Sequence, residues 1–506
     1  MKQAAIHTDK SFKISQVDKR MFGSFLEHMG RAIYEGIYQP ESPFADEDGI
    51  RTDVLKAVRE LGVTVVRYPG GNMVSAYNWE DGVGPKELRP VRLEAAWQNL
   101  EDNDFGTNEF MDWAGKAGIQ PMMAVNLGTR GVEAARNLLE YCNYDSGTYY
   151  SDLRIKHGYR KPHNVKLWCL GNEMDGPWQI GHRSAREYGI LAMQTAKIMK
   201  DIDPEVELAA CGSAGRSLPT FGEWDATVAE ICYRYIDFLS VHTYFDNRNV
   251  DEDDSRNFIA HDIAFADQIE SVIASCDYAK TKTKSKKKLY LSIDEWNVVY
   301  RPHGKIPADA RWTKAPHQIE DVYSLEDALL VGNMLITMLN HADRVKIGCL
   351  AQLVNVVAPI MTSDGSCWKQ PIFYPFRDCS RYAKGAVLKN VVDCERYDAK
   401  RYKDVPYVNA AVVYDEEAER LAIFAVNRDL CEDSSLTVDL RQFAGYRVEK
   451  QILLNHEDIK AVNTEHAPDH VHDILATRYA SVEGGVLSTV LEKHSWNVIL
   501  LSKEES

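Results

Sequence analysis

The sequence lacks both a long apolar run and an excess of positive charge. No stretch approaches the roughly 18 apolar residues that a membrane span needs, and the first residues lack the apolar core of a secretory signal. The formal net charge of −16 would repel phosphate backbones and anionic lipid surfaces. We therefore expect a cytoplasmic protein with no nucleic acid or membrane partner, acting on a neutral small molecule or polymer.

Signatures of bound phosphate, disulfides and metal are also missing. Neither G-x-x-x-x-G-K-[ST] nor G-x-G-x-x-G is present, so Gly70 and Gly71 are expected to shape a tight turn that presents Asn72. The ten cysteines include no C-x-x-C pair, and no His, Cys and Asp cluster has metal-ligand spacing. We expect reduced, mostly buried thiols, no cofactor and no metal.

Short apolar strands alternate with amphipathic helical segments from about residue 20 to residue 355. A capping box at Ser184 and Glu187 predicts a helix towards Lys200, and Gly62 suits a helix end. Eight strands are expected, at residues 21–26, 63–67, 120–125, 165–170, 206–211, 237–241, 289–293 and 347–353. This alternation predicts an α/β fold, a (β/α)8 barrel.

Helical periodicity nearly disappears beyond about residue 385. Two apolar runs at residues 408–414 and 421–427 flank a polar turn, which is typical of a hairpin. We predict an antiparallel β-sandwich after the barrel, and we assign the strand-like amino-terminal segment to it. The expected domains are a catalytic barrel at residues 18–385 and a sandwich made of residues 1–17 and 386–506.

Polar residues follow the predicted barrel strands. The carboxyl ends of the eight strands form one ring at the top of such a barrel, where active sites are built. The residues at or just beyond these ends are Glu27 with His28, Arg67, Asn126, Asn172 with Glu173, Ser213, His242 with Tyr244, Glu295 with Trp296, and Gln352. The ring predicts an active site at this face.

Glu173 and Glu295 stand out because each follows a buried strand and precedes a tryptophan by a few residues. Paired carboxyl groups beside aromatic rings indicate glycoside cleavage. One of them protonates the leaving oxygen, and the other stabilises the positive charge that develops on the sugar ring. A separation of about 5–5.5 Å would imply retention of configuration, and about 6.5–9.5 Å would imply inversion. The sequence leaves this distance open.

The expected surroundings divide the two roles. Tyr244 and Arg67 can donate hydrogen bonds to Glu295 and hold it ionised, which suits a nucleophile. Glu173 is expected beside Trp168, Trp178 and a second carboxylate, conditions that raise the pKa of a carboxyl group and suit a general acid.

The remaining polar residues are expected to bind substrate. Glu27, Asn72 and Asn172 would bind sugar hydroxyls, and Gln352 would close the ring. His242 is predicted to hydrogen-bond a neighbour rather than to shuttle protons.

These stretches resemble the α-L-arabinofuranosidases of glycoside hydrolase family 51, retaining enzymes of clan A. The matching segments are residues 22–30 (FGSFLEHMG), 67–72 (RYPGGN), 168–179 (WCLGNEMDGPWQ), 240–244 (SVHTY), 294–297 (DEWN) and 351–355 (AQLVN). The resemblance implies that Glu173 is the acid/base and Glu295 the nucleophile. It also implies a barrel with a carboxy-terminal β-sandwich that takes up the amino-terminal segment.

The same resemblance extends to the substrate site and the assembly. It implies that Glu27, Asn72, Asn172, Tyr244 and Gln352 hold a furanose, supported by Arg67 and His242, and that Trp97 lies on a substrate-side loop. No metal is implied, and hexamers are frequent in the family. We therefore expect an exo-acting enzyme that releases terminal L-arabinofuranose from arabino-oligosaccharides.

Two alternatives stay open at this point. Another clan A activity, such as an endo-glucanase or a β-xylosidase, would use the same ring with different loops. From a different class, the chain could be a non-catalytic carbohydrate-binding protein on an inactive barrel. The presence of both glutamates argues against the second.

Overall fold

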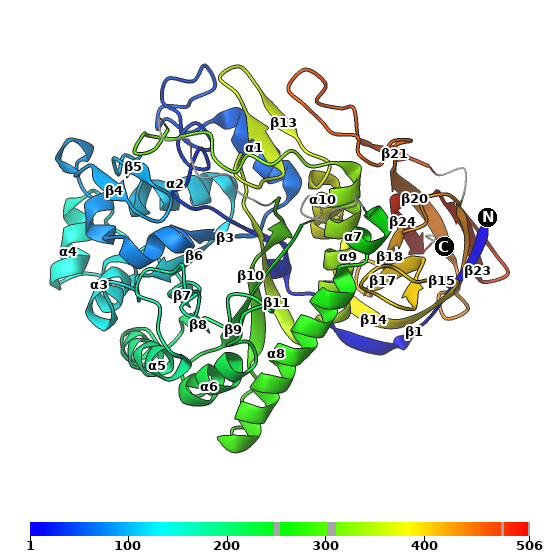
Figure 1. The fold of residues 1–506 in the computed structure, drawn as a ribbon, viewed down its shortest axis with the longest axis horizontal. Coiled ribbons are helices and arrows are strands. Elements are labelled where there is room, and N and C mark those ends of the chain that lie inside the picture. The colour runs from blue at the N-terminus through cyan, green and yellow to red at the C-terminus, as the bar shows by residue number, and fades with distance from the viewer. Residues whose placement is uncertain (247–253, 301–309, 477–479, 504–506) are drawn as a thin grey trace.

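The computed structural model describes residues 1–246, 254–300, 310–476 and 480–503. A closed barrel of parallel strands lies beside a second, β-rich unit (Figure 1). In chain order the barrel strands are β2 (Gly23–Phe25), β3 (Val65–Tyr68), β6 (Gln120–Val125), β7 (Leu167–Leu170), β8 (Glu207–Ala210), β9 (Phe238–Phe245), β10 (Tyr290–Val298) and β11 (Val345–Ala351). Each overlaps a strand expected from the sequence, so the predicted barrel is confirmed.

Helices surround the barrel, and two of them have the predicted start and end signals. They are α1 (Thr52–Leu61), α2 (Thr107–Ala117), α3 (Val132–Asn143), α4 (Tyr149–Lys156), α5 (Ala185–Ile202), α6 (Glu223–Cys232), α7 (Ser255–Ile259), α8 (Asp262–Lys282), α9 (Leu325–Asn340) and α10 (Phe373–Tyr382). Ser184 and Glu187 form the capping box that opens α5. Helix α1 ends at Gly62, whose φ of 79° is left-handed and costs glycine little.

Strand alternation places apolar side chains inside the barrel and polar ones at its mouth. Phe25, Val65 and Cys169 belong to the cluster that fills the interior. Successive side chains of a strand point to opposite faces, so the next inward positions along β2 and β3 fall at residues 27 and 67. Glu27 and Arg67 are therefore brought to the mouth by the same alternation that packs the core.

Strand β10 carries one extra residue at its carboxyl end. Ser292 pairs with Ser240 of β9, whereas Glu295 pairs with His242, so three steps on β10 match two on β9. The pairing of β10 with β11 shifts over the same residues. Such a bulge re-aims side chains. It allows the consecutive Asp294 and Glu295 both to reach the region of the mouth.

The second unit is one ten-stranded sheet in the order β21-β20-β24-β18-β17-β14-β1-β19-β23-β22. Its strands are β1 (Lys2–Gln16), β14 (Ala386–Cys394), β17 (Val408–Asp415), β18 (Arg420–Asn427), β19 (Ser434–Asp439), β20 (Tyr446–Leu454), β21 (Asp473–Leu475), β22 (Ser481–Glu483), β23 (Val486–Leu491) and β24 (Ser495–Lys503). Strand β1 pairs antiparallel with β14 and parallel with β19, which confirms that the amino-terminal segment joins this sheet. The exact division at residues 17/18 and 385/386 stays a prediction.

The sheet is curved around its own apolar core. Thr489 of β23 donates a hydrogen bond to Gln451 of β20, although these strands lie towards opposite ends of the sheet. One buried cluster joins side chains of β1, β14, β17, β18, β19, β23 and β24. The predicted sandwich is therefore a single curled sheet, with one parallel pair among antiparallel ones.

The two units are held together by buried contacts. Trp496 of β24 lies so close to Gly332 of α9 that an added Cβ would be 2.7 Å from its ring. Arg428 forms a buried ion pair of 2.5 Å with Asp262 at the start of α8. A short hairpin of β15 (Arg396–Tyr397) and β16 (Val405–Pro406) also packs, through Tyr397, against Ala260 beside α7.

The remaining expectations concern membranes and thiols. Among the described residues, no helix combines the length and apolar character that crossing a bilayer requires. All ten cysteines are free thiols and seven of them are buried. The expectation that the thiols are mostly buried is confirmed.

Candidate active site

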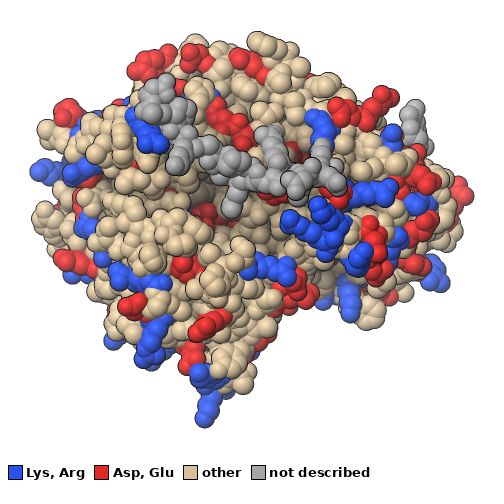
Figure 2. Space-filling model, viewed as in Figure 1, with Lys and Arg blue, Asp and Glu red and all other residues tan. Residues whose placement is uncertain are grey.

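A cavity of about 1070 Å³ opens at the carboxyl ends of the barrel strands. Figure 2 shows this face of the molecule, which is hollowed over the barrel. Eight of the ten predicted site residues line the cavity: Glu27, Asn72, Trp97, Glu173, His242, Tyr244, Glu295 and Gln352. The other two, Arg67 and Asn172, are almost fully buried and bond to residues of the lining.

Glu295 is held by the two donors expected from the sequence. Arg67 Nη1 donates to Oε1 of Glu295 at 2.7 Å, and the Tyr244 hydroxyl donates to Oε2 at 2.8 Å. Arg67 is only 1% exposed, so its charge acts on Glu295 with little screening by water. Hydrogen bonds of this kind fix the orientation of the carboxylate.

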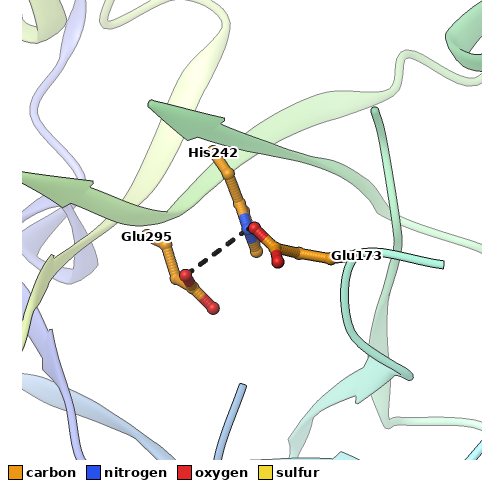
Figure 3. Close-up of side chains that lie close together, drawn as sticks. All are labelled: Glu173, His242 and Glu295. Atoms are coloured by element: carbon orange, nitrogen blue, oxygen red, sulfur yellow. Dashed lines mark hydrogen bonds and ion pairs between the residues drawn. The ribbon is translucent and has the colours of Figure 1, made fainter. Parts of the chain in front are cut away.

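Glu173 lies across the cavity, in the loop after β7. Its Oε1 contacts Nδ1 of His242 at 3.0 Å, and its Oε2 accepts a hydrogen bond of 2.7 Å from Trp178. Figure 3 shows Glu173, His242 and Glu295 close together, with a dashed line for the ion pair between His242 and Glu295. Burial raises the pKa of Glu173 and the negative charge of Glu295 adds to the rise, whereas the bonds from His242 and Trp178 oppose it. The net shift is upward, which confirms the direction expected for this carboxyl group.

The backbone at Glu173 is unusual. Its φ of 45° is left-handed, and Gly171 two residues earlier has a φ of 90°. Non-glycine residues in this region are uncommon and cluster at functional sites. This turn lets the chain leave β7 sharply while Glu173 points back into the cavity.

The two carboxyl groups are close together. One ligand atom each of Glu173, His242 and Glu295 lie within 4.8 Å of one another. Carboxyl groups about 5–5.5 Å apart permit attack on a sugar carbon by one of them, whereas about 6.5–9.5 Å leaves room for an intervening water. The spacing fits the shorter class, and therefore retention.

His242 also contacts a carboxylate beneath the cavity. Its Nε2 lies 3.1 Å from Oδ1 of Asp294, which is 1% exposed. Burial disfavours a charge on His242, but Glu295, Asp294 and Glu173 together raise the pKa of the imidazole to about 10. His242 is therefore a hydrogen-bonding partner of Glu173, as predicted, and carries a positive charge at neutral pH.

Arg67, Asn172 and Asn72 form a chain of hydrogen bonds along one wall. Arg67 Nη2 donates to Oδ1 of Asn172 at 2.7 Å, and Nδ2 of Asn172 donates to Oδ1 of Asn72 at 3.3 Å. Asn72 begins a short 3-10 helix directly after Gly71. The turn formed by the two glycines thus presents Asn72 to the cavity, as the sequence predicted.

Glu27 follows β2, which pairs with β3, so it lies beside this wall and is itself held in place. Its Oε1 accepts a hydrogen bond of 2.8 Å from the backbone of Met73, and its own backbone N–H donates to Oε1 of Gln352 at 2.9 Å. Burial raises the pKa of Glu27 to about 8, with Glu295 contributing in the same direction. Glu27 is therefore mostly protonated at neutral pH. The side-chain oxygen of Gln352 accepts the hydrogen bond that positions the backbone of Glu27.

Gly71 lies where an added side chain would crowd two carboxyl groups. A Cβ added there would be 3.0 Å from Oε1 of Glu295 and 3.2 Å from Oε2 of Glu27. The backbone approaches both carboxylates closely because position 71 has no Cβ.

Aromatic rings line the entrance. Trp97 lies between β4 (Arg92–Glu94) and β5 (Asn99–Glu101), and its backbone N–H donates to Glu94 at 2.7 Å. Trp178 is 52% exposed, so its ring faces the open cavity while its N–H holds Glu173. Exposed rings beside a carboxylate pair provide surfaces on which sugars can stack.

Trp168 and several residues of the predicted ring do not reach the cavity. Trp168 does not lie beside Glu173 as expected; it is buried with the outer core and its indole N–H donates to Val165, because alternation along β7 turns Leu167 and Cys169 inward instead. His28 bonds Glu101 and Tyr68. The other three members, Asn126, Ser213 and Trp296, also serve loops or the outer core.

Asp294 is a site residue that the sequence analysis missed. In a regular strand the residue directly before Glu295 would point to the opposite face, and the bulge in β10 changes this. Burial disfavours its charge, but the bond from His242 and the charge of Arg67 hold the pKa of Asp294 below its usual value.

The described residues bring together one set of three possible metal ligands, namely Glu173, His242 and Glu295. Both nitrogens of His242 already contact carboxylate oxygens. A metal at Nδ1 would have to replace the contact with Glu173. The absence of a metal requirement stays a prediction.

Comparisons with known proteins agree with this geometry. Residues 57–262 match the family model for the α-L-arabinofuranosidase 1 domain, and residues 294–495 match that for the α-L-arabinofuranosidase C-terminal domain. The chain is 54% identical over 505 residues to an intracellular exo-α-(1→5)-L-arabinofuranosidase of Halalkalibacterium halodurans, covering 99% of each chain. The chain belongs to the family 51 α-L-arabinofuranosidases.

Other arabinofuranosidases support the assignment over the full length. An intracellular exo-α-(1→5)-L-arabinofuranosidase of Bacillus subtilis is 53% identical, covering 100% of both chains. The solved structure of a family 51 α-L-arabinofuranosidase from Bifidobacterium longum superposes with a TM-score of 0.95 at 40% identity, covering 99% of each chain. A family 44 xyloglucanase of Paenibacillus polymyxa, at 10% identity and a TM-score of 0.62, shares the fold alone.

Proposed function

We propose that this arabinofuranosidase is a retaining, exo-acting enzyme that releases terminal L-arabinofuranose from arabino-oligosaccharides, with Glu173 as acid/base and Glu295 as nucleophile. The observation that carries the proposal is the close pair of carboxyl groups in different environments. Glu295 is held by Arg67 and Tyr244, and Glu173 has a raised pKa. A charged nucleophile facing a neutral acid is the arrangement that double displacement requires.

The reaction has two steps. In the first, an oxygen of Glu295 attacks the anomeric carbon, the bond to the leaving oxygen breaks, and Glu173 donates its proton to that oxygen. In the second, Glu173 takes a proton from water, the water oxygen attacks the same carbon, and the ester bond to Glu295 breaks. Two inversions at one carbon leave the configuration unchanged.

The walls of the cavity bind and orient the furanose. Glu27, Asn72, Asn172, Tyr244 and Gln352 bind its ring, with Arg67, His242 and Trp97 as neighbours. Glu27 is mostly protonated at neutral pH and can donate a hydrogen bond to the sugar. Arg67 and Tyr244 keep Glu295 in one orientation, so little reorganisation is needed when it attacks.

We infer a preference for α-1,5 linkages and a site of action inside the cell. Three relatives at 50–54% identity are named intracellular exo-α-(1→5)-L-arabinofuranosidases, whereas one at 42% identity is named an exo-α-(1→6)-L-arabinofuranosidase. Such an enzyme would degrade fragments of arabinan.

Product analysis tests this proposal. Incubation with α-1,5-linked arabinotriose should release arabinose one unit at a time, and proton NMR should show the α-anomer first. A first product with the β-configuration would contradict retention. Hydrolysis of nitrophenyl glucosides or xylosides at a comparable rate would favour another clan A activity, and binding without hydrolysis would favour a carbohydrate-binding protein.

We also propose that the enzyme assembles as a homo-oligomer, a hexamer by family resemblance. Light scattering coupled to size-exclusion chromatography measures the mass directly. A mass near six times the chain's 57.3 kDa would support the hexamer, and a monomer would contradict it.

A further inference from the structure

The cavity extends well beyond the two catalytic carboxyl groups. Its far end is lined by Phe245, His261, Arg401 and Tyr402. The last two come from the loop between β15 and β16, that is, from the β-rich unit and not from the barrel. The second unit therefore forms part of the wall of the active-site cavity.

A chain of contacts connects this far end to the catalytic residues. Phe245 follows Tyr244 on β9, and its ring lies 4.9 Å from the ring of His261. The ring of His261 lies 5.6 Å from that of Tyr402, whose hydroxyl is 3.1 Å from Nδ1 of the imidazole. The far wall is thus continuous with the residue that holds Glu295.

The loop that carries Arg401 and Tyr402, residues 398–404, is fixed before any ligand binds. Its ends are tied by a backbone bond from Asp404 to Oδ1 of Asp398 at 3.0 Å, and Lys403 pairs with the same side chain. The backbone of Arg401 donates to Asn257 at 2.8 Å, which attaches the loop to α7. A preorganised wall loses little conformational entropy on binding.

Side chains at this wall remain available to a ligand. Arg401 is exposed, and no carboxylate partner of its guanidinium lies among the residues that the structure describes. Tyr402 keeps part of its ring accessible. In contrast, Arg216 on the same lining pairs with Asp267.

The charges at this end favour a neutral ligand. Burial and the charge of Arg401 lower the pKa of His261 to about 4, so the imidazole is uncharged at neutral pH. Asp246 lines the same cavity, and its charge and that of Arg401 act in opposite directions on the pKa of His261. The remaining features, a donor with several N–H groups and a phenol ring, suit the hydroxyl groups and apolar face of a sugar.

We propose that Arg401 and Tyr402 form a distal subsite of the cavity, which binds a neutral sugar unit of the oligosaccharide beyond the one attached to the scissile bond. The proposal rests on the proposed function and adds that the β-rich unit determines preference for chain length. It assigns a role in binding to a segment whose residues lie outside the barrel.

Kinetics on short and longer substrates test the subsite. The variants are Arg401→Gln and Tyr402→Ala, and Lys400→Ala is the matched control because its side chain is exposed on the same loop but does not line the cavity. For each, kcat/KM is measured on 4-nitrophenyl α-L-arabinofuranoside, arabinobiose and arabinotriose. The nitrophenyl substrate is too short to reach the subsite.

The ratio of kcat/KM for arabinotriose to that for the nitrophenyl substrate should fall about tenfold in Arg401→Gln, the effect of losing one hydrogen bond to a charged group. Tyr402→Ala should change the ratio in the same direction, and Lys400→Ala should not change it. Because Tyr402 also packs on His261, the melting temperature of the Tyr402→Ala variant is measured as well. If that variant fails to fold, the Arg401→Gln variant alone decides the test.

Three outcomes would overturn the subsite. If Arg401→Gln leaves the ratio of kcat/KM for arabinotriose to that for the nitrophenyl substrate unchanged, Arg401 does not bind a distal sugar. If kcat/KM falls equally on all substrates, Arg401 contributes to folding instead. A much larger loss on a uronic-acid-substituted fragment than on arabinotriose would assign Arg401 to a carboxylate. If the unmodified enzyme fails to cleave the nitrophenyl substrate, the proposed function fails instead, so the two failures are distinguishable.

Discussion

His242 bridges two carboxyl groups, with Nδ1 3.0 Å from Oε1 of Glu173 and Nε2 3.1 Å from Oδ1 of Asp294. The imidazole is almost fully buried and is protonated at neutral pH, since its pKa is raised to about 10. A doubly protonated imidazole donates a hydrogen bond from each ring nitrogen. The bond to Asp294 fixes the orientation of the ring, and the bond from the other nitrogen then positions Glu173. Asp294 is thus a positioning residue for the proposed acid/base.

Replacing Asp294 by Asn should remove one of the charges that keep His242 protonated. We expect kcat/KM to fall by about 10²-fold, the cost of misplacing a catalytic group by ~1 Å. We also expect the alkaline limb of the pH profile to move to lower pH, because the pKa of His242 should fall. The profile between pH 5 and pH 10 measures both effects.

A matched control for this change is Asp343→Asn, which lies just before β11 and therefore at the end of the barrel away from the cavity. It should leave the profile unchanged. If Asp294→Asn lowers kcat/KM without moving the profile, Asp294 only stabilises the fold.

The proposed roles of the two glutamates predict different substrate dependence. Glu173→Ala should slow natural linkages by about 10²–10⁴-fold, the usual contribution of a general acid. It should slow the first step of nitrophenyl glycosides far less, because their leaving groups need no proton. Glu295→Ala should abolish turnover of both, measured as kcat/KM on each. Comparable losses on both substrate types in Glu173→Ala would contradict the acid assignment.

The predicted strand ends were enough to place much of the site. Arg67, His242 and Tyr244 lie at the mouth because they continue the inward phase of Val65 and Phe238, which belong to the interior cluster. The donors to Glu295 followed from the strand ends that the sequence predicted.

Features that depend on local irregularity or on docking could not be predicted in this way. A bulge changes the phase of β10, so Asp294 was missed, and Trp168 was assigned to the wrong face of β7. Arg401 and Tyr402 reach the cavity only because the β-rich unit packs on α7 and α8, a long-range arrangement that no local pattern in residues 386–506 encodes.

Gly71→Ala should impair activity more than stability. The added methyl group would lie 3.0 Å from Oε1 of Glu295, so the nucleophile or the turn must move. We expect kcat/KM to fall about 10²-fold, with a small change in melting temperature. Gly115→Ala in α2 is the control, because an added Cβ meets nothing within 4 Å and alanine favours a helix. Full activity in Gly71→Ala would show that the close approach is not needed.

Removing metal ions should not affect the enzyme. Arg67, Tyr244, His242 and Trp178 already satisfy the oxygens of the two glutamates, so no cation is needed to hold them. Dialysis against EDTA should leave kcat/KM on the nitrophenyl substrate unchanged. A loss that Zn²⁺, Ca²⁺ or Mn²⁺ restores would instead assign an ion to the cluster of Glu173, His242 and Glu295.

Glu27 should make the stability of the protein depend on pH between about 4.5 and 8. Its pKa is raised from 4.5 to about 8 in the folded protein, chiefly by burial. Between these values the folded state binds a proton that the unfolded state releases, so the contribution of Glu27 to the free energy of unfolding decreases as pH rises through this window. Glu27→Gln keeps a neutral group of the same shape and should remove that decrease. Urea unfolding at pH 5 and pH 8, compared between the unmodified protein and the Glu27→Gln variant, measures the difference.

Glu27→Gln should also retain more activity at pH 6 than Glu27→Ala, because an amide can still donate a hydrogen bond to the sugar. Equal losses of activity in the two variants would mean that the charged carboxylate is the form that binds.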